Sequence, residues 1–66
     1  MQDEIGQTAG LVWGFLDIHG ESSTLQIRSS LKITQTLLFL SLGWLAREGK
    51  VHLLYRDRCY WVSLRR

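Results

Sequence analysis

The feature that most constrains this chain is an abrupt change of hydrophobic period between residues 34 and 55. In the first part of this stretch, leucines recur at the spacing of one helix face: Leu38, Leu42 and Leu45. Arg47 and Gly49 follow at the positions where helices commonly end. Beyond the glycine, apolar side chains occupy every second position: Val51, Leu53 and Tyr55. The sequence therefore predicts a helix that ends near Glu48 and a half-buried strand directly after it.

Residues 3–18 are expected to form a first helix with a broad apolar stripe. Two adjacent rows have helical spacing: Ile5, Ala9, Val12 and Leu16, and then Leu11, Phe15 and Ile18. Gly20 is expected to end this helix. Three glycines share one of its faces, and each costs about 0.5–1 kcal/mol relative to alanine: Gly6, Gly10 and Gly14. That face is either a groove that another backbone approaches closely, or a thin side that lies under a loop or in solvent.

A second, shorter helix is expected at residues 25–31, with Ser23 or Thr24 as its N-cap. Its inward-pointing side chains are expected to be Leu25, Ile27 and Leu31. A turn follows, in which Ile33 fills the junction between the helices and Thr34 caps the third helix. The polar segment before this helix, residues 20–24, can add a third strand to a C-terminal hairpin.

The end of the chain has the pattern of a β-hairpin. If Asp57 and Arg58 are a two-residue loop, Arg56 faces Cys59 and three apolar pairs share one face of the hairpin. These pairs are Tyr55 with Tyr60, Leu53 with Val62, and Val51 with Leu64. Trp61 falls on the opposite face. Asp-Arg is not the usual pair for a tight hairpin turn, so a four-residue loop is the alternative.

Together these elements predict an α+β fold, a winged helix-turn-helix of three helices with a small antiparallel sheet whose β-hairpin is the wing. A chain of 66 residues forms a single domain, residues 1–66. Two strings, LGWLAREGKV at residues 42–51 and IG.TAG..W at residues 5–13, resemble a family of small, largely uncharacterised bacterial and archaeal winged helix-turn-helix proteins. The resemblance covers nearly the whole chain, and it implies this fold and a link to DNA.

The composition indicates a soluble and mildly basic domain. Hydrophobic residues make up 45% of the chain, which is far from a disordered composition, and no apolar run is long enough to span a membrane. The net charge is +2, and basic side chains concentrate in the last third of the chain. The N-terminal segment lacks the pattern of a secretion signal, and the single cysteine, Cys59, fits a reducing compartment. We therefore expect a cytoplasmic location.

The candidates for DNA binding are exposed polar and basic side chains of the third helix and the wing. In helix-turn-helix proteins the recognition helix enters the major groove, where side chains reach bases and phosphates. The candidate DNA-binding residues are Gln35, Thr36, Arg47, Arg56 and Arg58. The first two are expected to approach base edges or phosphates, and the three arginines to hold the backbone. Three more basic residues are candidates for phosphate contacts or are solvated surface: Arg28, Lys32 and Lys50.

The middle of the third helix carries apolar side chains at positions where a DNA-binding surface needs positively charged ones. Phe39 and Leu40 are expected to face outward, and exposed apolar pairs more often mark protein contacts. The candidate partner-interface residues are Phe39, Leu40, Gly43 and Trp61. We therefore expect a homodimer. The alternative to a DNA-binding regulator of transcription is a protein-interaction or dimerisation domain that binds no DNA.

The aromatic residues have two interpretations, as core residues or as base-stacking platforms. The core is favoured for Trp13 and Trp44, and a structural pair across the hairpin for Tyr55 and Tyr60. Trp61 is expected to cover Leu54 or to meet a second subunit.

The sequence supports neither an enzyme nor a metal site. The soft metal ligands, His19, His52 and Cys59, are too few and too scattered for zinc. Cys59 also lacks the surroundings of a nucleophile, and the chain has neither a phosphate-binding loop after a strand nor a carboxylate pair placed for acid-base chemistry. We expect no catalytic residue, no cofactor, no metal and no small-molecule substrate.

Overall fold

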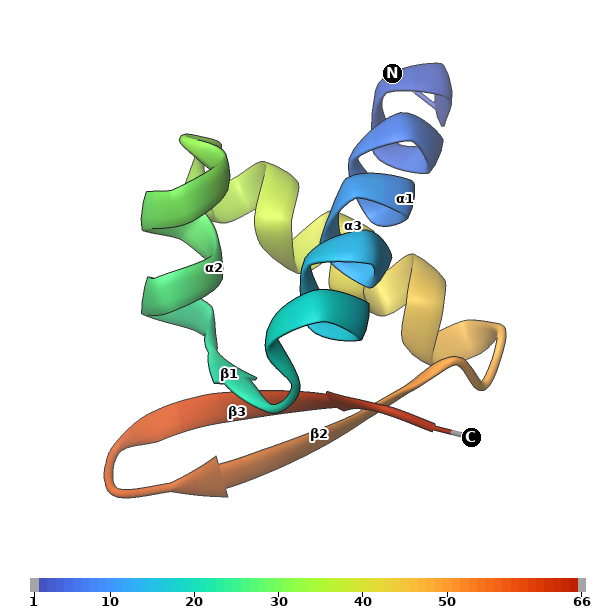
Figure 1. The fold of residues 1–66 in the computed structure, drawn as a ribbon. Helices are drawn as coiled ribbons and strands as arrows, with labels where there is room; N and C mark the ends of the chain where they lie inside the picture. Colours follow the sequence, from blue (N-terminus) through green and yellow to red (C-terminus); the bar gives the residue numbers. More distant parts are fainter. Residues whose placement is uncertain (1, 66) are drawn as a thin grey trace.

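The computed structural model describes residues 2–65, which form three helices and a three-stranded antiparallel sheet (Figure 1). In chain order the elements are α1 (Gln2–His19), β1 (Ser22–Ser23), α2 (Thr24–Leu31), α3 (Gln35–Arg47), β2 (Val51–Arg56) and β3 (Cys59–Leu64). The helices lie over one face of the sheet, and the tip of the β2–β3 hairpin projects beyond them (Figure 1). This is the predicted α+β winged helix-turn-helix, with the hairpin as its wing. No helix within residues 2–65 has the length and apolar character needed to cross a bilayer.

The helices begin and end at the residues that the sequence marks. Ser23 is the N-cap of α2, and its Oγ accepts a hydrogen bond from the Gln26 backbone N–H at 3.1 Å. Thr34 caps α3 in the same way, and its Oγ1 accepts from the Leu37 backbone N–H at 3.1 Å. Two glycines with left-handed backbone follow α1 and α3: Gly20 (φ 75°) and Gly49 (φ 70°). The predicted helix ends are thus confirmed.

Thr34 gives a direct test of this capping. Replacing it with alanine removes the acceptor for the Leu37 N–H, so the free energy of unfolding is expected to fall by about 1 kcal/mol. Chemical denaturation followed by circular dichroism measures the change. Thr36→Ala, at an exposed position inside α3, is the matched control and should be nearly neutral. Equal losses in the two variants would contradict the capping role.

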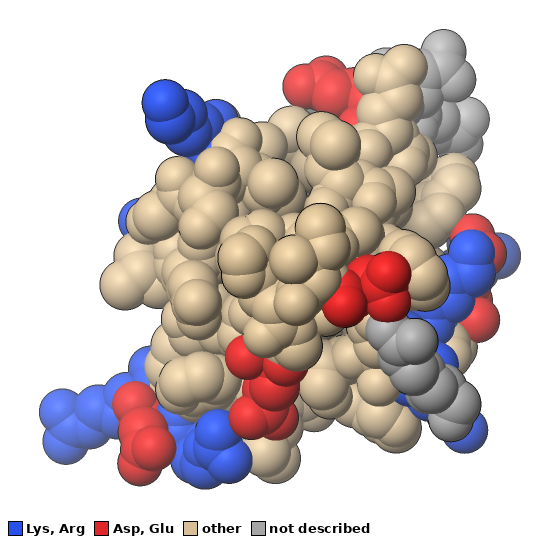
Figure 2. All heavy atoms as spheres, viewed as in Figure 1, with Lys and Arg blue, Asp and Glu red and all other residues tan. Residues whose placement is uncertain are grey.

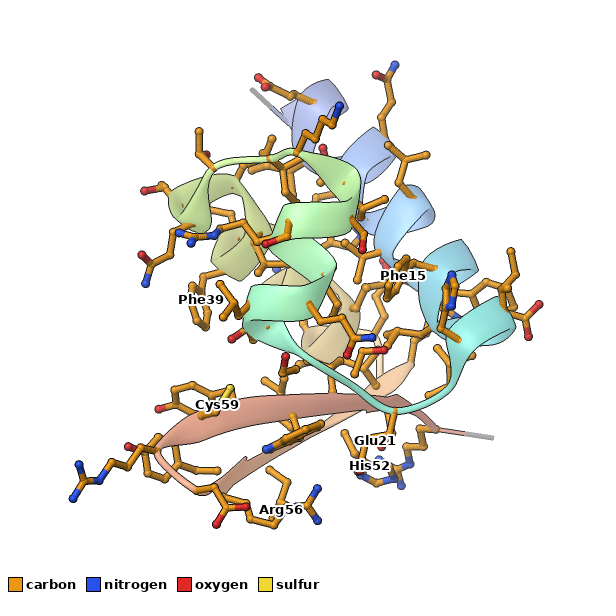
Figure 3. The ribbon with its side chains drawn as sticks, turned by 60° about the vertical axis from the view of Figure 1, so that its left-hand side comes forward. Phe15, Glu21, Phe39, His52, Arg56 and Cys59 are labelled. Carbon is orange, nitrogen blue, oxygen red and sulfur yellow. The ribbon has the colours of Figure 1, made fainter. Side chains whose placement is uncertain are left out.

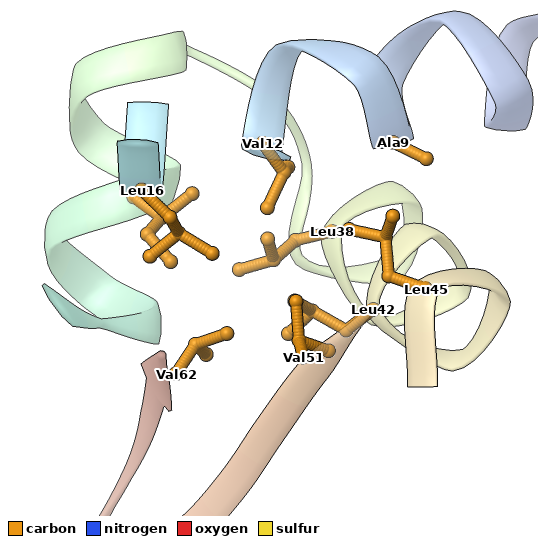
Figure 4. Packing of buried hydrophobic residues seen from close by; sticks show 9 residues of the cluster. Ala9, Val12, Leu16, Leu38, Leu42, Leu45, Val51 and Val62 are labelled. Carbon is orange, nitrogen blue, oxygen red and sulfur yellow. The ribbon is translucent and has the colours of Figure 1, made fainter. Parts of the chain in front are cut away.

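The core lies between α1, α3 and the sheet, as Figure 4 shows. Its buried side chains are Ala9, Val12, Leu16, Ile27, Leu38, Leu42, Leu45, Val51 and Val62. The predicted leucine row of α3 is therefore buried. On α1 the row that ends at Leu16 is buried apart from the half-buried Ile5, while Phe15 and Ile33 pack against the core from its margin.

Three apolar side chains predicted to face inward are exposed instead: Leu11, Ile18 and Leu25. Ile18 is 80% exposed and Leu25 is 59% exposed. Each of the three lies two positions from a buried residue of its own helix, which places it about 200° around the helix axis and therefore on the opposite side. The predicted apolar stripe of α1 was too broad, because only the side of α1 that meets α3 and the sheet is covered.

The sheet has the predicted register. β3 is the central strand, and β1 pairs with it at Ser22–Val62 and Ser23–Trp61, so the expected third strand is present. The pairs between β2 and β3 include Val51 with Leu64, Leu53 with Val62, Tyr55 with Tyr60, and Arg56 with Cys59. Asp57 and Arg58 form a two-residue loop with φ of 55° and 62°. Positive φ at both loop residues is the geometry of a primed hairpin turn, so the four-residue loop is wrong.

The core positions predicted for Trp13 and Trp44 are wrong. These side chains are 39% and 40% exposed, and they line a groove of about 250 Å³ between α1 and α3, together with Gly10. Rings of this size cover the margin of a small core instead of entering it. The glycine face of α1 is open, because apart from chain neighbours and the backbone of α1 itself no described atom lies within 4 Å of a Cβ built at Gly6, Gly10 or Gly14.

Candidate nucleic-acid interface

A cleft of about 290 Å³ lies where α2, the N-terminal half of α3 and the wing meet. It is lined by Thr24, Leu25 and Arg28 from α2, by Gln35, Leu38 and Phe39 from α3, and by Tyr55, Arg58, Cys59 and Tyr60 from the hairpin. Local structure explains how these elements meet. Lys32 ends α2 in the left-handed conformation (φ 56°), and Thr34 begins α3 two residues later, so the two helices lie close together. We call this hollow the wing cleft.

Three aromatic rings form a row along the wing cleft. The Phe39 ring on α3 meets the Tyr60 ring edge-on, with 6.0 Å between centroids, and Tyr60 meets Tyr55 with 4.9 Å between centroids. Figure 3 shows Phe39 on the side of the molecule where the wing projects. The predicted tyrosine pair is present, but Tyr55 is 61% exposed and Tyr60 is 44% exposed, because this end of the hairpin extends past the helices. We call Phe39, Tyr60 and Tyr55 the aromatic row.

Two arginines of the wing cleft are electrostatically available. Among the side chains that the structure describes, those of residues 4–65, there is no ion pair for Arg28 or Arg58, and no Asp or Glu lines the cleft. Arg56 differs, because its guanidinium contacts the Glu21 carboxylate at 3.2 Å and lies over the Trp61 ring at 4.9 Å from the centroid. Figure 3 shows Arg56 and Glu21 on the side of the sheet away from the helices. The cleft therefore has cations free to meet an external anion.

The residues predicted to bind DNA are brought together in part. Gln35 and Arg58 line the same cleft, and the exposed Thr36 lies beside Gln35 in an adjoining shallow hollow. Arg47 lies at the other end of α3, about 18 Å from Gln35 along the helix axis. Arg56 is on the far side of the sheet, as described above. The structure thus groups Gln35, Thr36 and Arg58, and separates Arg47 and Arg56 from them.

The residues predicted to contact a partner protein are also divided. Phe39 lines the wing cleft and shares a second hollow with Leu40, which also lies one helical turn before Trp44 of the α1–α3 groove. Gly43 is exposed, and apart from its chain neighbours and the backbone of its own helix no described atom lies within 4 Å of a Cβ built there. Trp61 is half-buried on the other side of the sheet, opposite Leu54, and its Nε1 donates to the Arg56 carbonyl at 3.2 Å. Phe39, Leu40 and Gly43 therefore remain on one exposed side of α3, and Trp61 is separated from them.

Sequence reasoning missed that Tyr55, Tyr60 and Leu25 belong to the candidate site. A signal for the tyrosines was available, because they are the second cross-strand pair from the loop. A pair next to the loop lies at the end of the strands farthest from the buried Val51, so a pair this close to the tip is expected to be exposed. The sequence contains no such signal for Leu25, because the exposure of this side chain depends on the orientation of α2 relative to α3.

Charged side chains lie mainly at the periphery of the molecule. Figure 2 shows a largely uncharged surface with a basic group at the hairpin tip and further basic groups beside the ends of the helices. Within residues 4–65, no three His, Cys, Asp or Glu side chains come close enough together to hold a metal ion.

Comparison with known proteins agrees with this geometry. The model of the family described as winged helix-turn-helix domain (DUF2582) matches residues 1–64. An uncharacterised protein of the archaeon Methanocaldococcus jannaschii, MJ1608, is 34% identical over 68 residues, which cover 98% of this chain and 96% of that protein. No solved structure matches the chain significantly. The order of three helices and a hairpin, and the family match over nearly the whole length, lead to one conclusion: the chain belongs to the DUF2582 family of winged helix-turn-helix domains.

Proposed function

We propose that this domain binds DNA through the N-terminal end of α3 and the tip of the wing. The observation that carries the proposal is the wing cleft, where one surface is lined by Gln35 at the start of α3 and by Arg28 and Arg58, which have no ion pair among the side chains of residues 4–65. Membership of a winged helix-turn-helix family supports it further, because helix-turn-helix proteins place the N-terminal residues of the recognition helix against base edges. Transcription regulation is the process that such a domain would serve.

The electrostatics of α3 favour an anion at this end. The first backbone N–H groups of a helix point outward with a partial positive charge, and they bind phosphate well. Gln35 and Thr36 are exposed there and supply side-chain donors. The Arg28 and Arg58 guanidinium groups, on α2 and on the wing, are placed to contact phosphates beside them. Of the other predicted DNA-binding residues, Arg56 is already held by Glu21 and Arg47 is remote.

The arginines of the wing cleft provide the first test. In the double variant Arg28→Ala, Arg58→Ala, two phosphate contacts are lost, so the slope of log K against log salt is expected to become shallower by about 2. Affinity for a generic duplex at low salt should fall about tenfold or more. Fluorescence anisotropy at several salt concentrations measures both quantities.

The single variants Arg58→Ala and Arg47→Ala give the matched comparison, because each removes one positive charge and Arg47 lies at the opposite end of α3 from the cleft. Arg47→Ala should change the slope much less than Arg58→Ala. Equal effects of the two variants would show that DNA does not bind preferentially at the wing cleft. No binding of either duplex or single-stranded DNA by the unmodified protein at low salt would refute the proposed function itself.

We also propose that the domain acts as a homodimer through the open side of α1 and α3. The supporting observations are the half-exposed rings of Trp13 and Trp44 in one groove, the exposed Leu40 one turn away, and Gly10 and Gly43 with empty space above them. Apolar surface of this kind is typical of protein interfaces, and glycines let helices approach closely. We call Gly10, Trp13, Leu40, Gly43 and Trp44 the tryptophan surface. Arg28, Arg58, Tyr55 and Tyr60 of the wing cleft lie on α2 and the wing, outside this surface, while Leu40 also borders the hollow beside Gln35 and Thr36.

A further inference from the structure

The aromatic row leaves ring faces available inside the wing cleft. The Phe39 and Tyr60 rings are inclined by 80°, and the Tyr60 and Tyr55 rings by 63°. An edge-to-face contact covers at most one face of one of its two rings, so flat surfaces of the row remain open. All three side chains are exposed, whereas in a larger domain neighbouring elements could cover such rings. The cleft therefore offers stacking surface to a planar group from outside.

The charges beside the row identify the planar group. Arg28 and Arg58 flank the rings and have no ion pair among the side chains of residues 4–65, and the lining of the cleft within those residues has no acidic side chain. A ligand that fits this pattern is flat, apolar on its faces and linked to negative charge at short range. Nucleobases joined by phosphates have all three properties, and aromatic rings with a basic groove are the general means of holding them.

Duplex DNA cannot use the rings, because its bases are stacked on one another and only their edges reach the grooves. Base edges interact best with hydrogen-bonding groups. The apolar side chains of the cleft, Leu25 and Phe39, therefore contact base edges poorly. Bases that have left the duplex expose their faces. The wing cleft therefore makes more favourable contacts with a single strand than with a closed duplex.

We infer that the wing cleft binds single-stranded nucleic acid, with unpaired bases stacked on Phe39, Tyr60 and Tyr55 and phosphates held by Arg28 and Arg58. This inference rests on the proposed function, since it specifies the form of nucleic acid that the same site takes. Few polar side chains in the cleft can read a base, so binding tolerates many sequences.

The test compares three labelled probes by fluorescence anisotropy at one salt concentration. They are a thymidine oligonucleotide of about 12 nucleotides, an abasic oligomer of the same length, and a duplex of the same length. The unmodified protein is expected to bind the thymidine strand about tenfold more tightly than the abasic strand, because only the former supplies bases, and more tightly than the duplex. The variant Tyr55→Ala, Tyr60→Ala should lose most of the preference for bases and keep the weaker binding of the abasic strand.

Two variants control for the fold. Leu54→Ala removes an exposed apolar side chain of the same strand on the opposite face of the hairpin, and it should leave binding unchanged. Tyr60→Phe keeps the ring, so it should retain the preference for bases. Thermal denaturation of every variant verifies that the hairpin variants are folded at the assay temperature.

The outcomes are distinguishable. Tighter binding of the thymidine strand that depends on the two tyrosines supports the inference. Duplex binding at least as tight as that of the thymidine strand, or equal binding of the thymidine and abasic strands, overturns it while leaving the proposed function intact. Binding of none of the three probes overturns both.

Discussion

Leu42→Ala is expected to lower the Tm by about 12–24 °C. Leu42 is 1% exposed and lies between α1 and the sheet in the centre of the core (Figure 4). Truncating a fully buried leucine costs about 2–5 kcal/mol, because the lost methyl groups leave a cavity that the surroundings fill only in part. For a domain of this size each kcal/mol corresponds to about 4–8 °C, so a loss of about 3 kcal/mol gives the stated shift.

The effect is large relative to the total stability of so small a domain. A 66-residue protein has a free energy of unfolding of about 3–10 kcal/mol, so this single change removes a substantial fraction of it. Leu40→Ala is the matched control: it makes the same chemical change two positions earlier, where the side chain is exposed. Differential scanning calorimetry of the two variants should give clearly different Tm values. Similar losses would mean that α3 is rotated relative to the orientation described here.

The second large effect is expected at Leu40→Glu, which should convert a homodimer into monomers. A carboxylate in the middle of the tryptophan surface would have to be desolvated without a partner, and central interface side chains commonly contribute 2 kcal/mol or more. The dissociation constant should therefore rise by about 30-fold or more. Sedimentation equilibrium at several concentrations measures it against the mass of 7.7 kDa for one chain.

Leu25→Glu is the control for this change, because it adds the same charge at an exposed leucine outside the tryptophan surface. It should leave the mass unchanged. A single-chain mass of the unmodified protein at every concentration would refute the homodimer. Equal dissociation by both variants would place the interface elsewhere.

The elements of this fold were predictable because each depends on residues close together in sequence. The helix ends depend on Ser23, Thr34, Gly20 and Gly49, each of which acts on its own or adjacent turns. The hairpin register follows from matching apolar partners on one face, since a shift by one residue would turn every side chain over. Such local signals were also sufficient to identify the family resemblance.

The extent of burial was not predictable in the same way. Periodicity marks Leu11 and Ile18 of α1 as apolar, but whether a neighbouring element covers them depends on the angle and number of packed elements. A domain with three helices has no element left to cover the outer side of α1. For the same reason Trp13 and Trp44 remain at the margin of the core.

The candidate site was predictable only in its separate parts. Gln35 and Arg58 could each be selected by residue type and position, but their nearness to Arg28, Phe39 and Tyr60 arises from three elements that meet in space. The sequence also predicted that Phe39 and Leu40 belong to the same partner interface, because they are neighbours in the chain. They do line one hollow, but about 100° around the helix separates them, so Phe39 also reaches the wing cleft and Leu40 lies on the side of Trp44.

The loop at the wing tip has a consequence for how the domain can adapt to a ligand. Asp57 and Arg58 both hold left-handed backbone conformations, which cost a residue with a Cβ about 1–2 kcal/mol each relative to right-handed ones. We therefore expect the residue pairs of the hairpin next to this loop to open at a lower free energy than the pairs that include Val51 and Val62, which are buried in the core. Because Arg58 is carried by this loop, its guanidinium can be repositioned by a local change of the tip that leaves the helices undisturbed.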